Sequence, residues 1–167
     1  MKRIALGFVG VAFALAGLVA IAGADATLSD SLKEELRDAK YAYVSSTRKD
    51  GSLGRPAELW FFYHDGAVYV GTGPGSWRVK RIKAGRPAAK IWIGKPNGPS
   101  MFQASDADLK DLASFEATGS IVDDPKIHQA MFKAYAEKYP DGWPKHEQGF
   151  RTGFKDGSRV LVKYVPK

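Results

Sequence analysis

Hydrophobic residues are distributed differently in the first 26 positions than in the rest of the chain. Met1-Lys2-Arg3 gives a positively charged start, and residues 4–22 then contain no charged side chain. Ala24-Asp25-Ala26 follows, which is the small-residue pattern of a signal-peptide cleavage site. A retained membrane anchor is the alternative, because about 20 apolar residues just span a bilayer. Since the run is rich in Ala and Gly, we expect cleavage after Ala26 and no stable membrane insertion.

Beyond this leader, short alternating runs separated by turn residues predict a mainly β domain. Six strands are expected, at residues 41–47, 57–64, 67–72, 88–94, 115–122 and 159–165. Asp50-Gly51 and Asp65-Gly66 have the residue types of tight hairpin turns, so the first three strands are expected to form a meander. Six short strands with few helices predict a small antiparallel barrel or sandwich.

Helical spacing of apolar residues predicts three helices. They are expected at 28–36, where leucine recurs every fourth residue, at 76–84, and from Pro125 to about Tyr135. Asp124-Pro125 supplies the cap and first-turn proline of the third helix. We expect a loop at 139–144, and the pattern of 95–112 favours neither a helix nor a strand.

Composition and charge narrow the picture further. Removal of residues 1–26 leaves one domain, residues 27–167, and lowers the net charge from +7 to +6. The chain has no cysteine, which excludes a disulfide framework, thiolate metal sites, iron–sulfur clusters and a cysteine nucleophile. The positive balance favours anionic ligands without selecting one. We expect this domain to be periplasmic or secreted.

The segment Leu59-Trp60-Phe61-Phe62-Tyr63 is apolar at every position. A strand with one face in solvent would alternate instead, so both faces of this segment must be covered. Either a helix or a second subunit could supply the cover.

A glycine-rich turn followed by basic residues is the segment most informative about chemistry. Thr72 ends a strand, residues 73–75 read Gly-Pro-Gly, and Ser76 and Arg78 begin the next helix. Arg78 lies in the first turn, where the helix dipole disfavours a cation by about 0.3–1 kcal/mol, and a phosphate bound there would explain it. The alternative is a solvated basic helix. The segment is not a P-loop, because no Gly-Lys-Ser/Thr is present.

Several other residues offer chemistry of their own. Arg48 and Arg55 flank the first hairpin and are candidates for further phosphate donors. The histidines, His64, His128 and His146, lack metal-ligand spacing, so we predict no metal site. His64 is expected to be a turn residue and His128 to be exposed, with a haem ligand as the alternative role for any of the three. No G-x-S-x-G motif is present, and an exported protein is not expected to bind nucleic acid.

The order of these segments resembles the pyridoxamine 5'-phosphate oxidase-like FMN-binding split-barrel family. The resemblance covers residues 38–94 well, the final strand looks like the family's closing strand, and residues 95–145 fit in outline only. The segments that carry it are Tyr43 to Thr47, Asp50-Gly51, Arg55-Pro56, Leu59-Trp60-Phe61, Asp65-Gly66, Val68 to Thr72, Ser76-x-Arg78, Arg86-Pro87 and Arg159 to Pro166.

The resemblance implies a six-stranded antiparallel split β-barrel that forms a homodimer, with FMN in a groove between subunits. A second subunit would then account for the doubly apolar segment. By position, Thr47 and Arg48 fall where the family contacts the flavin. Thr72, Ser76 and Arg78 fall where it holds the phosphate, although the family usually has lysine at the Arg78 position.

Two further positions depart from the family pattern. Trp77 is an unusual neighbour for the phosphate residues; it is a candidate to stack on a ring or to cover the core. Arg151 is a candidate for the basic residue that the pyridoxal-forming members use for substrate, near the carboxyl end.

The function implied by the resemblance is an FMN-dependent oxidoreductase of unknown substrate. A deazaflavin would use the same residues. The alternatives are a haem-binding split barrel, which needs one of the three histidines as ligand, and a periplasmic binding domain without a cofactor, because fold alone does not fix function.

Overall fold

The computed structural model describes residues 28–95, 104–105 and 107–167. The predicted signal peptide, residues 1–26, lies outside the described residues, as does most of the unassigned segment between residues 96 and 106. In the part of the chain that is described, no helix combines the length and apolar character needed to cross a membrane.

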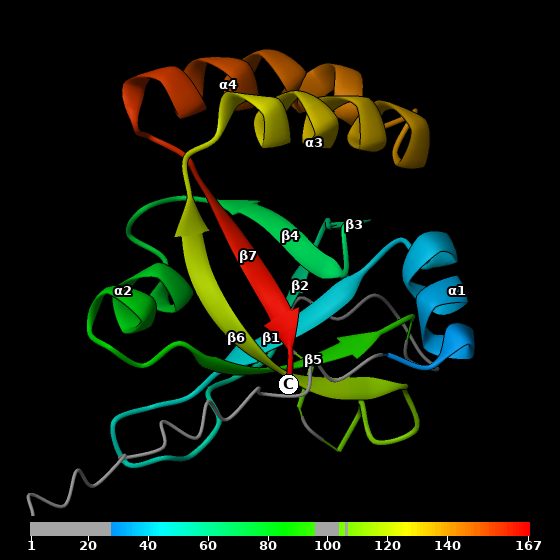
Figure 1. Cartoon of the computed structure of the whole chain (residues 1–167), viewed down its shortest axis with the longest axis vertical. Coiled ribbons are helices and arrows are strands. Elements are labelled where there is room, and N and C mark those ends of the chain that lie inside the picture. Colours follow the sequence, from blue (N-terminus) through cyan, green and yellow to red (C-terminus); the bar gives the residue numbers. More distant parts are fainter. Residues whose placement is uncertain (1–27, 96–103, 106) are drawn as a thin grey trace, which may run out of the picture.

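A curled antiparallel sheet forms the centre of the molecule (Figure 1). Its seven strands are β1 (Ala42–Ser46), β2 (Ala57–Leu59), β3 (Phe62–His64), β4 (Ala67–Thr72), β5 (Ala88–Ile93), β6 (Ser114–Val122) and β7 (Val160–Pro166), in the order β2-β1-β5-β6-β7-β4-β3. The edge strands β2 and β3 are separated in the chain by Trp60 and Phe61 alone. The sheet must therefore curl until its edges nearly meet, which confirms the predicted split barrel.

The strand count is seven rather than six because the predicted strand 57–64 is divided. Its first half pairs with β1, with Leu59 opposite Ala42, and its second half pairs with β4, with Phe62 opposite Tyr69. The expected meander of three strands is therefore broken, since the chain leaves one edge of the sheet and joins the other. The β3–β4 hairpin itself turns at Asp65-Gly66 as predicted, with both residues at positive φ.

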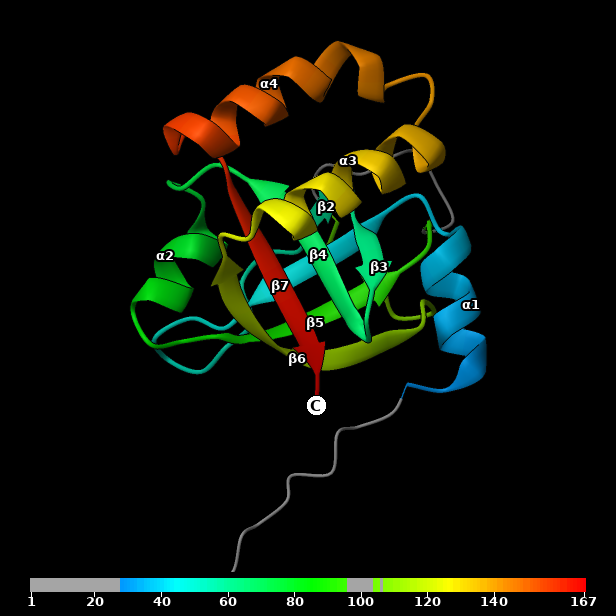
Figure 2. The same cartoon turned by 45° about the horizontal axis from the view of Figure 1, so that its top comes forward.

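In the described part of the chain, four helices surround the sheet: α1 (Asp30–Asp38), α2 (Trp77–Lys83), α3 (Pro125–Lys138) and α4 (Trp143–Asp156). The first three confirm the predicted helices, and the Asp124 side chain caps α3 by accepting from the Lys126 amide at 2.8 Å. The sequence did not predict α4. This helix begins at Trp143, so the expected loop 139–144 is shorter than predicted and ends at Gly142. Figure 2 shows α3 and α4 together over one side of the barrel, with α1 and α2 at its flanks.

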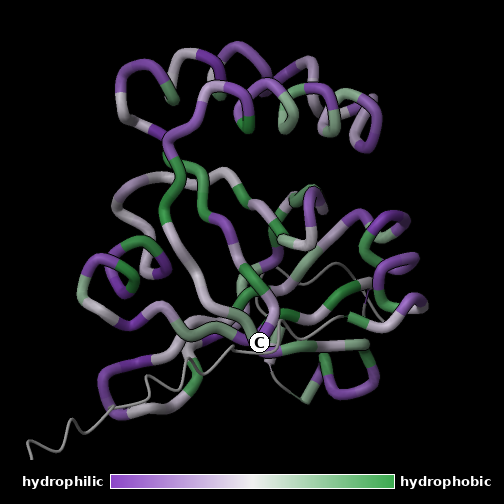
Figure 3. Tube along the Cα trace, in the orientation of Figure 1, coloured by the Kyte–Doolittle hydropathy of each residue, from purple (hydrophilic) through white to green (hydrophobic). Residues whose placement is uncertain are grey.

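The buried side chains form three clusters. One fills the barrel between the inner faces of the strands, closed by Leu36 of α1 and Val79 of α2. A second, largely aromatic cluster lies between the α3–α4 pair and strands β3, β4 and β7. A third, smaller cluster packs Tyr43 and Trp92 against Ala104 and Leu109. Figure 3 shows the hydrophobic positions that supply these clusters along the strands and along one side of α3.

The aromatic cluster explains the doubly apolar segment 59–63. Trp60 stacks on Tyr139 with ring centroids 4.4 Å apart and planes at 8°, and Phe62 lies edge-on to Tyr135 of α3. The cover is thus supplied by helices of the same chain, so this segment does not by itself require a second subunit.

Candidate functional site

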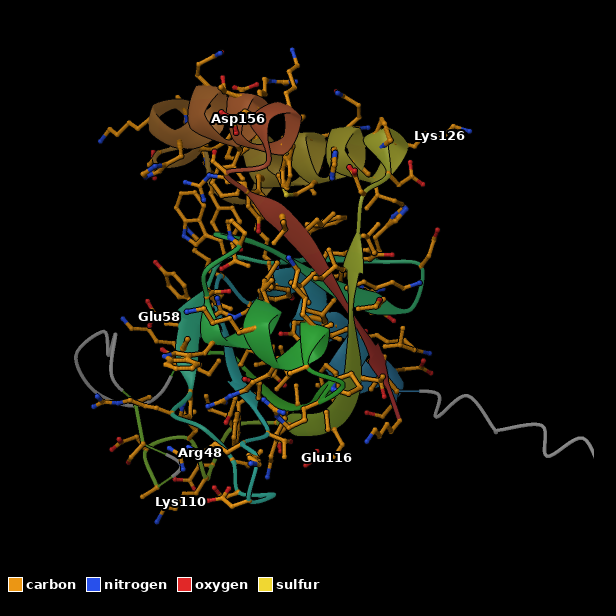
Figure 4. The ribbon with its side chains drawn as sticks, turned by 90° about the vertical axis from the view of Figure 1, so that its left-hand side faces the viewer. Arg48, Glu58, Lys110, Glu116, Lys126 and Asp156 are labelled. Carbon is orange, nitrogen blue, oxygen red and sulfur yellow. The ribbon has the colours of Figure 1, made fainter. Side chains whose placement is uncertain are left out.

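An open cavity of about 510 Å³ lies beside the start of α2. Strands β1 and β2, the loop between them and α2 supply its lining: Val44, Ser46, Arg48, Arg55, Ala57, Ser76, Trp77, Arg78 and Arg81. Four of these residues are arginines and none is a carboxylate. Figure 4 faces α2 and shows Arg48 on the loop below it. A cavity of this composition is suited to an anion.

Arg78 is the most enclosed of the four arginines. Its Nη1 donates to Thr72 Oγ1 at 2.7 Å, while its Nε and the nearby Ser76 Oγ are buried with no hydrogen-bond partner in the described chain. Burial lowers the pKa of the Arg78 guanidinium, and the group that acts in the other direction is the Tyr164 phenol rather than a carboxylate. Because a buried polar group left unpaired costs about 1–3 kcal/mol, a bound anion would stabilise this arrangement.

Arg81 is fixed by the first strand. Its Nη1 donates to the Ser46 carbonyl at 2.5 Å and to Ser46 Oγ at 2.9 Å. Partial burial lowers the pKa of Arg81, and the neighbouring charges of Arg48 and Arg86 lower it further. A Cβ at position 54 would lie within 3.0 Å of this guanidinium, so a side chain there would displace Arg81 from its present position. The positive charges are therefore held close to one another by the fold.

Trp77 stands on the rim of the cavity with 71 % of its surface exposed. Lys80 Nζ lies 5.1 Å and Arg81 Cζ 5.9 Å from the centre of its ring, both within the range of a cation–π contact. The sequence left two roles open for Trp77, to stack on a ring or to cover the core. Because the side chain is exposed, the second role is wrong.

The structure brings most of the predicted site residues together. Arg48, Ser76, Trp77 and Arg78 line the cavity, as does Arg55, and Thr72 contacts it through Arg78. Thr47 lies beside the cavity without lining it, where its amide donates to the Ala88 carbonyl at 3.0 Å. The sequence did not single out Ser46 as a residue of the site. The structure does so, because Ser46 is a polar residue buried in strand β1.

The three histidines lie elsewhere. His64 is on the β3–β4 hairpin next to Asp65, and His146 of α4 lies edge-on to Trp60. The expectation that His128 is exposed is wrong: it is buried, stacks on Phe154 with centroids 4.1 Å apart, and leaves Nε2 unpaired. None of them lines the arginine cavity, and among the described residues no three His, Cys, Asp or Glu side chains are grouped to hold a metal.

Arg151 also lies outside this cavity. It is on α4, where it pairs with Glu147 at 2.6 Å and lies over the Phe132 ring at 4.3 Å. Within one chain, this arginine therefore contributes to the packing of α3 against α4 and not to the candidate site.

The fold is similar to that of several proteins of known structure. No family model and no curated protein matches the sequence. Solved structures do: the conserved hypothetical protein Rv2991 from Mycobacterium tuberculosis is 17 % identical over 86 % of this chain and 84 % of its own, with a TM-score of 0.60. A putative pyridoxamine 5'-phosphate oxidase from Listeria innocua is 16 % identical over 83 % and 92 %, with a TM-score of 0.54.

HutZ, a haem storage protein from Vibrio cholerae, is 14 % identical over 84 % of this chain and 90 % of its own, with a TM-score of 0.56. At these identities the likeness concerns the fold and not the activity. The chain therefore has the split-barrel fold that the pyridoxamine 5'-phosphate oxidase-like proteins have, as the resemblance predicted.

Proposed function

We propose that this protein binds a flavin, FMN in the first instance, in the arginine-lined cavity and acts as an oxidoreductase on a substrate yet to be identified. The observation that carries the proposal is the pair of buried, unpaired polar atoms, Arg78 Nε and Ser76 Oγ, in a cavity with four arginines and no carboxylate. A phosphate group has three strong acceptor oxygens, which suit this set of donors. The residues present therefore fit the phosphate of FMN.

Each residue has a separate task in this proposal. Arg78 and Ser76 donate to the phosphate, and Thr72 orients Arg78 through the contact at 2.7 Å. Arg81, fixed by Ser46, adds positive charge beside them. A bound flavin ring supplies the hydride or electron chemistry, so no side chain is required as a catalytic acid or base. A deazaflavin with the same phosphate would use the same donors.

Two wider properties belong to the same proposal. We propose a homodimer, as the family resemblance implies, although segment 59–63 gives it no support because α3 and α4 cover that segment. We also propose export to the periplasm or cell exterior, on the basis of the leader at residues 1–26. A single sedimentation boundary of monomer mass at micromolar concentration would exclude the dimer.

An absorbance spectrum tests the flavin proposal directly. The purified protein is incubated with excess FMN, desalted and scanned, with haemin used in a parallel sample. We expect the near-ultraviolet and blue bands of flavin to remain with the protein. A retained Soret band without flavin would favour the haem alternative, and a colourless protein after both incubations would favour a binding domain without a cofactor.

A further inference from the structure

Trp77 is unlike the other tryptophans of the chain. Trp92 and Trp143 are 4 % and 2 % exposed, and Trp60 is stacked on Tyr139, whereas Trp77 is 71 % exposed. Among the described residues it shares large exposed apolar surface only with Val165. A large aromatic ring exposed at the rim of a cavity contributes nothing to the core, and its place beside two cations leaves it free to stack on a planar, anionic ligand.

The cations near Trp77 are arranged by depth. Arg78 has its Nε fully buried at the inner end, Arg81 is half-buried, and Lys80 is exposed. Residues three and four positions apart are neighbours on a helix, so Lys80 and Arg81 both lie beside the Trp77 ring, at 5.1 and 5.9 Å. Arg81 therefore lies both in the lining of the cavity that holds Arg78 and beside the indole.

We propose that this rim is a nucleotide subsite, in which Trp77 stacks on a nucleobase and Arg81 and Lys80 contact a phosphate joined to that base. The inference rests on the proposed flavin site and extends it: the preferred ligand is a dinucleotide, which carries a second phosphate and a second planar ring beyond the flavin phosphate. Charge complementarity favours this occupant, because cations flank the indole and every nucleobase offers a flat face for stacking.

Binding of FMN and FAD provides the test. Both are titrated by equilibrium dialysis against the full protein and against Trp77→Ala and Trp77→Phe. Since stacking of one base on an aromatic side chain changes affinity by about tenfold or more, we expect FAD to bind at least about tenfold more tightly than FMN. Trp77→Ala should abolish that ratio by weakening FAD more than FMN, and Trp77→Phe should keep most of it. Equal affinities in the unchanged protein, or an equal loss for both ligands in Trp77→Ala, would overturn the subsite.

A second readout separates this inference from the flavin proposal. Trp77 is the tryptophan most accessible to acrylamide, so AMP alone should protect part of the tryptophan emission from quenching, and Trp77→Phe should lose that protected fraction. Protection by AMP without any flavin binding would support the subsite and remove the flavin proposal. Tight FMN binding without protection by AMP would do the reverse. An indole that acrylamide does not reach in the ligand-free protein would mean that a second copy of the chain covers it, which also overturns the subsite.

Discussion

The aromatic cluster under α3 and α4 and the arginine-lined cavity beside α2 differ in how their hydroxyl and guanidinium groups are paired. In the cluster, the Tyr139 hydroxyl accepts from the Phe61 amide at 2.9 Å and lies 3.0 Å from the Lys40 carbonyl, and the Tyr135 hydroxyl donates to the Trp60 carbonyl at 2.9 Å. In the cavity, Arg78 Nε and Ser76 Oγ have no hydrogen-bond partner among the described residues.

This difference separates residues that stabilise the fold from residues that we propose to bind a ligand. Paired hydroxyls inside an aromatic cluster fix the approach of the helices to the sheet. Among the described residues the cluster has two unpaired nitrogens of its own, Trp143 Nε1 and His128 Nε2, but neither lines the arginine cavity. At the cavity the unpaired atoms lie with four arginines, an arrangement that an anion completes.

The largest effect is expected in the cluster. Trp143 is 2 % exposed and packs against Phe150 and Tyr135. Trp143→Ala should lower the free energy of unfolding by about 3–5 kcal/mol, because it removes a large buried side chain and leaves a cavity. Urea unfolding measures it, with Trp77→Ala as the exposed control, for which we expect a change within about 0.5 kcal/mol. Comparable losses in the two variants would contradict the division between the regions.

The second effect belongs to the cavity. Arg78→Gln should weaken FMN binding by about 1.5–3 kcal/mol, because a charge-assisted contact with phosphate is lost. The free energy of unfolding should change by less than about 1 kcal/mol, since the guanidinium is buried without a counter-ion. Calorimetric titration and urea unfolding measure the two quantities. Arg151→Gln is the matched control on α4 and should leave FMN affinity unchanged; a variant of Arg78 that binds FMN normally would remove the phosphate site.

The smallest effect concerns pH and lies at the edge of the cluster. Burial lowers the pKa of Lys138 to about 8, although its Nζ contacts the Leu36 carbonyl at 3.2 Å and lies 3.6 Å from the centre of the Phe61 ring. Above that pH the folded protein has released a proton that the unfolded chain still holds, up to its ordinary lysine pKa. Stability should therefore rise with pH from about 8 to about 10.5, by about 1 kcal/mol between pH 7 and 9.

The comparison protein for this effect is Lys138→Met, in which the titrating group is absent. Urea midpoints of both proteins at pH 7, 8 and 9 give the difference in stability directly. Because both states of the unchanged protein hold the proton below pH 8, the difference between the two proteins should be constant there. Parallel pH profiles throughout would contradict a buried cation at this position.

Local turn and cap chemistry was enough to predict several elements. Asp65-Gly66 forms the β3–β4 turn, and Asp124 caps α3, as their residue types indicate. The division of 57–64 was not predictable in this way, because both halves have the composition of a strand and the break at Trp60–Phe61 is imposed by closure of the barrel. Helix α4 was missed because Gly149 and Gly153 interrupt a weak apolar period, and packing on the aromatic cluster overrides that propensity.

The wrong or missing predictions about individual side chains have the same cause, which is packing between residues far apart in the sequence. His128 is buried because α4, which the sequence did not reveal, places Phe154 over it. The contact between Arg81 and Ser46 joins residues 35 positions apart, so only the tertiary structure shows it. Arg48, Ser76, Trp77 and Arg78 were candidates from the sequence because they are close to recognisable turns, and the structure places all of them on one cavity.

Binding of FMN and of riboflavin to the unchanged protein tests the central claim most directly, because the two differ only in the phosphate that the arginine-lined cavity is proposed to hold. Calorimetric titration at one fixed salt concentration gives both dissociation constants. The account predicts that FMN binds at least about tenfold more tightly than riboflavin, the effect of one charge-assisted phosphate contact. Equal dissociation constants, or binding of neither compound, would contradict it.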